Sequence, residues 1–374
     1  MKTKFFIIPI LTFLLFGSSA VLIEAASPNF LPAPLRNHEM LLEASSSGIQ
    51  EVKLIARPKT SSSEIKKLSK RTLYRHKFWK VEGKTYDIPI RYNSKVKRII
   101  RRLTTKKRKQ VIKGMRHSGK YMPMMEKMLH EAGMPLDLVY MVSAESNFNV
   151  RARSHKSAVG LWQFIASTGR LYGLKINRWI DERRDPILST QAAITYLKHL
   201  YGLFGDWELA MAAYNTGEGR VKRAIKLAKR KGQKHNFSSL RLPRETRNYV
   251  PAIMALSVIY KNPERYGFGH VKKMKPMDET QGNLTVAFSL EEIAKRSKIS
   301  FRTLRELNPA LYLGVPPMKQ KNYSFYIPKL HQQELLTSLG KNPEPSKQWS
   351  RSYNKLLGNS ASVTRILEKF GAPV

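Results

Sequence analysis

One carboxylic acid, Glu145, stands where a carboxyl group could act as a proton donor. In the stretch LDLVYMVSAES, Leu138, Val142 and Glu145 follow at four- and three-residue steps, so in a helix they lie on or beside one face. A carboxyl group held against apolar surface loses hydration in its charged form, which raises its pKa towards neutrality. Such a group could protonate the oxygen of a glycosidic bond. The alternative is that Glu145 merely ends a helix.

Other catalytic chemistries have no support in the sequence. His130 and Glu131 lack the second histidine of the zinc-binding pattern HExxH, and the nine histidines are scattered along the chain. Neither a GxxxxGK[ST] phosphate-binding loop nor a GxSxG nucleophile elbow is present. We therefore expect no metal ion and no cofactor.

The charge balance of the chain is strongly basic. Among 374 residues, 67 lysines and arginines face 27 acids, which gives a formal charge of +40 and a positive field that attracts polyanions. The segment 95–120 holds many of these cations, yet it has no aromatic residue between Tyr92 and Tyr121 for stacking on bases. We expect this basic face to contact an anionic wall or membrane surface, and we expect no specific nucleic acid.

Residues 1–20 have the pattern of a secretory signal peptide. Lys2 and Lys4 precede an apolar stretch over residues 5–16, and the small residues at 18–20 suit a cleavage site. Because the uncharged stretch continues to Ile23, an uncleaved anchor is the alternative. The sequence has no cysteine, and therefore neither a disulfide nor a lipidated cysteine. We expect an exported protein of the periplasm or cell envelope, and favour cleavage over the anchor.

Sequence patterns divide the rest of the chain into four parts. Residues 21–90 read as a basic linker or N-terminal arm, because proline, serine and charge alternate without a sustained period. Residues 91–270 have helical spacing, with start signals at Pro135, Asp185 and Asp206 and breaks at Gly217 and Gly219. Residues 284–330 read as strand, helix, helix and strand, and residues 331–374 as a polar tail. The predicted fold is mainly α, with a small βααβ unit near its end.

Five blocks in one order resemble the soluble-lytic-transglycosylase class of lysozyme-like enzymes. They are AESNF at 144–148, GLWQ at 160–163, STGRLYGL at 167–174, AAYNTGEGRV at 212–221 and LPRETRNYVP at 242–251. A single block would be weak evidence, but five in order make a chance match improbable. The resemblance implies a lysozyme-like helical catalytic domain.

The resemblance also implies a mechanism and a set of site residues. Glu145 would act first as acid and then as base on the bond between N-acetylmuramic acid and N-acetylglucosamine. The muramoyl 6-hydroxyl would replace water as nucleophile and leave a 1,6-anhydro end, which agrees with the high effective concentration of an intramolecular nucleophile. The substrate-binding residues implied are Ser146, Gly160, Gln163, Tyr214, Asn215 and Tyr249. From the sequence, Trp162 could line the cleft or fill the core, and Asp181, Asp185 and Glu218 are the acids that folding could bring near Glu145.

The βααβ unit resembles a LysM peptidoglycan-binding domain in the stretch IAKRSKISFRTLRELNP and in the final YIP. The Gly-Asp pair that usually precedes the first LysM helix is absent, since Ala287 and Phe288 lead directly to Ser289. Glycan binding and a purely structural role are both open for this unit.

Three functions remain open for the whole chain. The first is an exported transglycosylase that acts on peptidoglycan glycan strands. The second is a true lysozyme, which would use water and leave a reducing end. The third is a wall-binding protein on an inactive scaffold, and the presence of all the implied site residues weighs against it.

Overall fold

The computed structural model divides the chain into two compact units, Met1–Leu73 and Tyr74–Val374. It describes residues 78–284, 289–312, 314 and 323–331, together with three short strands in the first unit. The predicted signal peptide, and the predicted tail beyond residue 331, lie outside the described residues. Within the described part, no helix combines the length and the apolar character needed to cross a bilayer.

The first unit contains a three-stranded antiparallel sheet in the order β1, β2, β3. Its strands are β1 Val21–Leu22, β2 His38–Glu43 and β3 Lys53–Pro58. Val21 pairs with Leu42, and His38 pairs with Pro58. This sheet lies within the segment that the sequence predicts to be a linker or arm.

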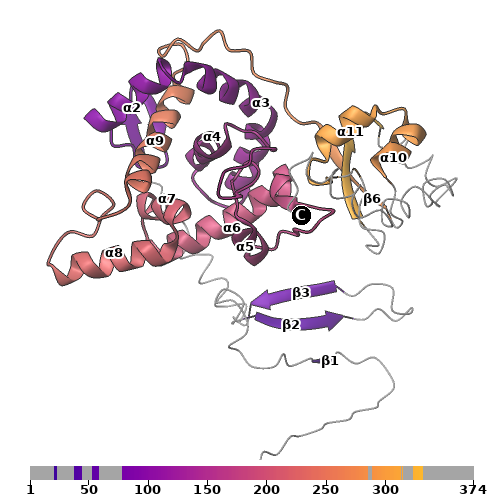
Figure 1. Ribbon diagram of the computed structural model, residues 1–374, viewed down its shortest axis with the longest axis horizontal. Coiled ribbons are helices and arrows are strands. Elements are labelled where there is room, and N and C mark those ends of the chain that lie inside the picture. Colours follow the sequence, from indigo (N-terminus) through magenta and orange to yellow (C-terminus); the bar gives the residue numbers. More distant parts are fainter. Residues whose placement is uncertain are drawn as a thin grey trace, which may run out of the picture. The chain divides into compact units, whose positions relative to one another are not determined.

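The second unit is mainly helical, which confirms the predicted fold class (Figure 1). Its longer helices are α2 Ser94–Thr104, α3 Arg108–Glu131, α6 Pro186–Phe204, α7 Trp207–Thr216, α8 Glu218–Arg230 and α9 Arg244–Lys261. The shorter ones are η2 Leu136–Val139, α4 Tyr140–Ser146, α5 Ala166–Leu171 and η3 Glu182–Arg184. Helix α4 lies inside the arrangement of α3, α6 and α9, and its buried apolar residues belong to the main core.

Helices α6 and α7 begin at residues that the sequence marks as start signals. The Asp185 carboxylate accepts hydrogen bonds from the backbone N–H groups of Ile187 and Leu188, with Pro186 in the first turn of α6. Asp206 caps α7 in the same way through Leu209 N–H, at 2.8 Å. Gly217 ends α7 with a positive φ of 85°, which glycine adopts without the strain that a side chain would add. The break predicted at Gly219 is wrong, because that residue lies inside the first turn of α8.

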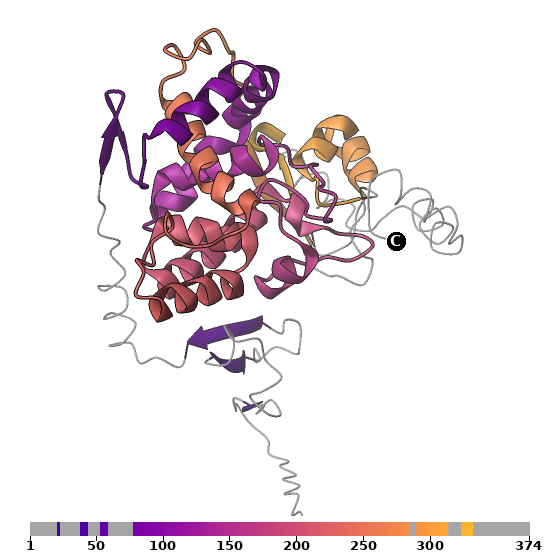
Figure 2. The same cartoon turned by 60° about the vertical axis from the view of Figure 1, so that its left-hand side comes forward.

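The helical unit begins earlier than the predicted boundary at residue 91. A hairpin of β4 Trp79–Val81 and β5 Lys84–Tyr86 precedes α2, and Figure 2 shows it at the edge of the helices. Tyr86, Ile88 and Ile90 are buried in the same core as the helices. The end of the predicted 21–90 linker is therefore corrected, since burial of these side chains makes residues 86–90 part of the folded core.

The C-terminal part has the predicted order of strand, helix, helix and strand. Its elements are β6 Glu279–Leu284, α10 Leu290–Ser297, α11 Phe301–Leu307 and β7 Tyr323–Pro328, followed by η4 Lys329–His331. Strands β6 and β7 are antiparallel, with Glu279 opposite Pro328. Ser289 and Ser300 cap the two helices through Glu292 N–H and Thr303 N–H. The first strand was expected from residue 284 onward, but β6 ends there, and residues 285–288 lie outside the described part.

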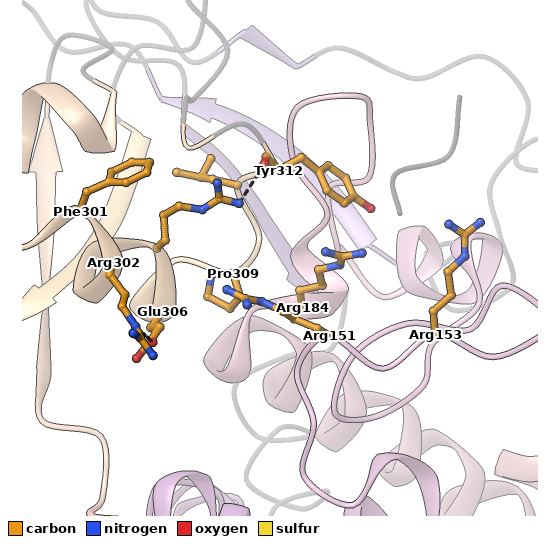
Figure 3. A pocket seen from close by; sticks show the side chains of 10 residues that line it. Arg151, Arg153, Arg184, Phe301, Arg302, Glu306, Pro309 and Tyr312 are labelled. Carbon is orange, nitrogen blue, oxygen red and sulfur yellow. Dashed lines mark hydrogen bonds and ion pairs between the residues drawn. The ribbon is translucent and has the colours of Figure 1, made fainter. Parts of the chain in front are cut away.

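This C-terminal part packs on the segment 176–185 of the helical unit. Asp181 N–H donates to Ala310 O at 2.9 Å, and Tyr312 N–H donates to Trp179 O at 3.2 Å. Trp179 and Ile180 are buried in one apolar cluster with residues of α10, α11 and β7. The Arg184 guanidinium lies 4.6 Å from the ring centre of Tyr312, and Figure 3 shows these two side chains close together.

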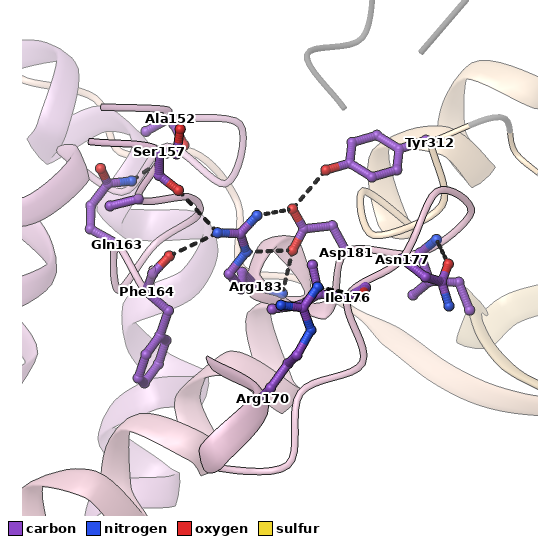
Figure 4. A network of polar contacts seen from close by, with 12 residues as sticks. Ala152, Ser157, Gln163, Phe164, Arg170, Ile176, Asn177, Asp181, Arg183 and Tyr312 are labelled. Atoms are coloured by element: carbon purple, nitrogen blue, oxygen red, sulfur yellow. Dashed lines mark hydrogen bonds and ion pairs between the residues drawn. The ribbon is translucent and has the colours of Figure 1, made fainter. Parts of the chain in front are cut away.

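A buried ion pair, Asp181–Arg183, lies at the centre of this contact (Figure 4). Arg183 Nε and Nη2 donate to the two carboxylate oxygens of Asp181 at 2.8 and 2.7 Å, and neither side chain is more than 3% exposed. The remaining Arg183 nitrogen, Nη1, donates to Ser157 O and Phe164 O. Tyr312 O–H donates to Asp181 Oδ2 at 2.7 Å. The pair therefore joins three segments that are far apart in the sequence.

Replacing Asp181 by asparagine should lower the free energy of unfolding by about 3 kcal/mol, because it leaves the Arg183 charge buried without its carboxylate. Chemical denaturation monitored by circular dichroism measures this change. Glu291→Gln is the matched control, since Glu291 pairs with Lys295 on an exposed helix face and should cost under about 0.5 kcal/mol. Equal effects of the two substitutions would contradict the central role of Asp181.

Candidate active site

Glu145 lies in the last turn of α4, next to the hydroxyl of Tyr249 from α9. The Tyr249 O–H donates to Glu145 Oε1 at 2.5 Å, although the two residues are 104 positions apart in the sequence. Both side chains are half-buried. The structure thus brings together the expected acid and one of its expected neighbours.

The pKa of Glu145 is raised to about 7, chiefly because burial removes water from its charged form. The hydrogen bond from Tyr249 opposes this shift, and the negative charge of Glu245 adds a little to it. A carboxyl group with such a pKa is partly protonated near neutral pH, and can both donate and accept a proton.

The chain reverses sharply just after Glu145. Asn147 and Phe148 both have left-handed backbone angles, with φ of 51° and 56°, which cost free energy in residues other than glycine. Phe148 is 1% exposed in the core, where its ring lies near that of Tyr260. Packing of this ring holds the reversal in place and so fixes the end of α4 that carries the acid.

The loop with Gly160 and Gln163 is held by close contacts with backbone carbonyl oxygens. Gly160 has φ of 85°, and a Cβ built on it would lie 1.8 Å from Arg183 O, so only glycine fits. Gly160 N–H and the Gln163 side-chain amide both donate to Ala152 O, at 3.0 and 3.2 Å. The Gln163 amide also donates to Gly160 O at 2.8 Å. Two of the expected substrate-binding residues are therefore fixed relative to one another.

Ser146 and Trp162 anchor this loop to the helical core. The Ser146 hydroxyl lies 2.8 Å from Leu161 O and donates to it, which ties the end of α4 to the loop. Trp162 is fully buried, and its indole N–H donates to Thr190 Oγ1 at 2.9 Å. Of the two roles that the sequence left open for Trp162, the structure therefore supports the core.

Tyr214 is the centre of an aromatic group beside the same loop. Its hydroxyl donates to Trp162 O at 2.7 Å, and its ring lies 5.2 Å from that of Tyr196 and 6.1 Å from that of Phe164. Burial raises the pKa of Tyr214 well above its ordinary value, and the charge of Glu145 raises it further. Tyr214 thus stays neutral and lies within electrostatic range of the acid.

Asn215 is held by the first turn of α9. Its side-chain oxygen accepts a hydrogen bond from the Thr246 hydroxyl at 2.8 Å, which joins α7 to α9. Thr246 is buried, whereas Asn215 is half-buried. This bond leaves the Asn215 amide N–H groups available to a ligand.

The three acids considered as partners of Glu145 are engaged elsewhere. Asp181 pairs with Arg183, Asp185 caps α6, and Glu218 accepts a hydrogen bond from the Tyr196 hydroxyl at 3.4 Å. The acid that does influence the pKa of Glu145 is Glu245, which sequence reasoning missed. Its position four residues before Tyr249, one helical turn away, could have indicated it. Glu245 is exposed and lies 3.7 Å from Lys156.

Comparison with known proteins gives a family match for the region that contains Glu145. Residues 123–237 match the family described as "Transglycosylase SLT domain". Over this span the chain is similar to a transglycosylase SLT domain. The matched span includes every expected site residue except Tyr249, and the predicted resemblance is confirmed.

Two named proteins are similar in sequence to parts of this chain. "Membrane-bound lytic murein transglycosylase D" of Escherichia coli (strain K12) is 39% identical over 224 residues, which cover 59% of this chain and 48% of that protein. "Peptidoglycan transglycosylase gp16" of Escherichia phage T7 is 36% identical over 121 residues, 32% of this chain and 9% of that protein. The chain spans about half the length of the first of these relatives.

A solved structure, the lytic transglycosylase Slt of Pseudomonas aeruginosa, is similar at 22% identity and a TM-score of 0.29. The match covers 40% of this chain and 25% of that one. So partial an overlap carries no argument about mechanism.

Gly160→Ala should lower the free energy of unfolding by at least about 2 kcal/mol more than Gly173→Ala, because the added methyl group meets Arg183 O. Gly173 is a matched control, since its φ of 89° imposes similar backbone strain while no atom lies within 4 Å of its Cβ position. Thermal or chemical denaturation of both variants measures the difference. Similar losses of stability in the two variants would show that the backbone near Arg183 can shift to make room for the added methyl group.

Tyr249→Phe should raise the pKa of Glu145 above its wild-type value of about 7, because the lost hydroxyl stabilises the charged carboxylate. Carbon NMR of labelled glutamate carboxyls across a pH titration measures this midpoint. Tyr260→Phe is the control, since the Tyr260 hydroxyl contacts Ser143 and should leave the midpoint unchanged. A lower pKa in Tyr249→Phe would contradict the assigned role of the hydroxyl.

Proposed function

We propose that the protein is a peptidoglycan lytic transglycosylase that cleaves the bond between N-acetylmuramic acid and N-acetylglucosamine without water. The observation that carries this proposal is Glu145, a half-buried carboxyl group with a pKa raised to about 7 and a hydrogen bond from Tyr249. The SLT domain match and the names of the two relatives support the same activity.

The reaction needs only one carboxyl group on the protein. Protonated Glu145 gives its proton to the glycosidic oxygen as the bond to muramoyl C1 breaks. The muramoyl 6-hydroxyl then bonds to C1 and returns its proton to the Glu145 carboxylate, which closes the 1,6-anhydro ring. Atoms and charge balance without any other reactant, and the acid returns to its starting state.

The surroundings of Glu145 favour this single-acid chemistry over an enzyme with two carboxylates. Glycosidases of the usual kind place a second carboxylate across the scissile bond. Asp181, Asp185 and Glu218 are held by other partners, and Glu245 faces solvent beside Lys156. In the proposed site Tyr249 orients Glu145, Ser146 fixes the loop, and Gly160, Gln163, Tyr214 and Asn215 line the path of the glycan.

The same proposal suggests a cellular location for the protein and roles for its positive charge and its C-terminal part. A peptidoglycan substrate implies a place in the cell envelope, with export through the signal peptide predicted at residues 1–20. The charge of +40 attracts a polymer that carries peptide carboxylates, and supplies affinity more than selectivity. The packing of the LysM-like part on the segment 176–185 supports a structural role for it, while glycan binding by that part stays a prediction.

Digestion of purified sacculi, followed by mass spectrometry of the muropeptides, tests the proposal. Wild-type protein should release 1,6-anhydro ends, with a rate that falls above about pH 7 as Glu145 loses its proton. Glu145→Gln should lower the rate by about a thousandfold or more, since removing a general acid and base typically costs two to four orders of magnitude. Glu131→Gln, at an exposed helix end, is the control.

Hydrated reducing ends would instead identify a lysozyme. No product from the wild-type protein, together with retained binding to sacculi, would identify a binding protein. Either result would overturn the proposed function.

A further inference from the structure

A hollow of about 360 Å³ lies between the first two turns of α2 and of α9. The two helices are neighbours in the second unit (Figure 1), and the Lys95 ammonium group joins them by donating to Arg247 O at 2.7 Å. All six lining residues are polar, four of them are cations, and none is an acid. They are Ser94, Lys95, Arg98, Arg244, Arg247 and Asn248.

Helical spacing separates this hollow from the candidate active site. Arg244, Arg247 and Asn248 follow at three- and four-residue steps, so they share one face of α9. Thr246 and Tyr249 lie on another face of the same helix, and their hydroxyls contact residues of the candidate active site. A ligand in the hollow would therefore bind on a different side of α9 from the glycan.

The positive charge of the hollow has no counterpart in the part of the chain that the structure describes. There, none of the four cations forms an ion pair, and the guanidinium groups of Arg98, Arg244 and Arg247 donate no hydrogen bond. Burial lowers the pKa of Lys95, and the charges of Arg247 and Arg98 lower it further. The cations therefore repel one another, and an anion between them would relieve that repulsion.

The donors around the hollow suit a phosphate group. A guanidinium group presents paired N–H groups that match two oxygens of a phosphate. The Ser94 hydroxyl and the Asn248 amide add neutral donors, and neither has a hydrogen-bond partner among the described residues. A phosphomonoester brings up to two negative charges and three acceptor oxygens, whereas a carboxylate brings one charge and two oxygens. Four cations together therefore favour the phosphomonoester.

We propose that this hollow is a binding site for a phosphomonoester group, supplied either by free phosphate or by the headgroup of an anionic lipid. The proposal does not depend on the proposed function, because no glycan takes part in it. It also differs from general attraction of polyanions to a basic chain, since a defined set of donors on two helices would select phosphate among anions.

Titration calorimetry of the full chain with inorganic phosphate at low salt tests the site. Phosphate should bind wild-type protein more tightly than acetate does. Arg98→Gln and Arg247→Gln should each weaken phosphate binding about tenfold, the loss expected for one charge-assisted hydrogen bond. Both side chains are exposed, so these substitutions leave the packed core intact.

Arg223→Gln is the matched control, because it removes the same charge from an exposed position of α8. It should leave the phosphate affinity unchanged. Equal weakening by Arg223→Gln would reduce the effect to general attraction and overturn the proposal. Acetate binding as tight as that of phosphate, or unchanged affinity in both Arg98→Gln and Arg247→Gln, would overturn it as well.

Sedimentation with vesicles distinguishes the two sources of the phosphomonoester. Phosphatidylcholine vesicles with phosphatidic acid carry this group, whereas vesicles with phosphatidylglycerol at equal negative charge carry only phosphodiesters. For a lipid ligand, wild-type protein should bind the phosphatidic acid vesicles at about tenfold lower lipid concentration, and Arg98→Gln should remove that difference. For free phosphate as the ligand, both vesicles should bind equally, and the loss in Arg98→Gln should be confined to the soluble titration. Neither measurement involves cleavage, so the result is independent of transglycosylase activity.

Discussion

The buried pair of Arg183 and Asp181 is the contact on which the arrangement around the candidate site depends. Arg183 donates to Ser157 O and Phe164 O on the loop that carries Gly160 and Gln163, while Asp181 accepts a hydrogen bond from the Tyr312 hydroxyl of the C-terminal part. The backbone of Arg183 also lies against Gly160. Two buried charges stabilise each other only when their hydrogen bonds are well aligned. This pair therefore favours one relative position of the three segments.

The acid itself depends on a balance between burial and one hydrogen bond. Loss of water favours the neutral form of Glu145, and the Tyr249 hydroxyl favours the charged form. The pKa of about 7 is the balance of these opposing effects, and a carboxyl group near this value can both give and recover a proton. The approach of α9 to α4 makes the second effect possible, because it brings the Tyr249 hydroxyl within hydrogen-bonding distance of the carboxyl group.

Local signals in the sequence predicted much of the fold. Asp185, Asp206 and Ser289 begin helices because their side chains meet backbone N–H groups a few residues away. Glu145 could be predicted as the acid only through the blocks around it, since helical spacing alone also fits a simple helix end. The Asp181–Arg183 pair and the influence of Glu245 could not be read in advance, because they depend on how distant segments meet.

The left-handed turn at Asn147 and Phe148 has a consequence for heat resistance. Two successive residues in this conformation store backbone strain directly beside the acid, and the buried Phe148 ring offsets it. Warming that loosens the packing around this ring would release the turn before the long helices α3 and α9 melt. The end of α4 that carries Glu145 would then lose its order on heating before the helical signal falls.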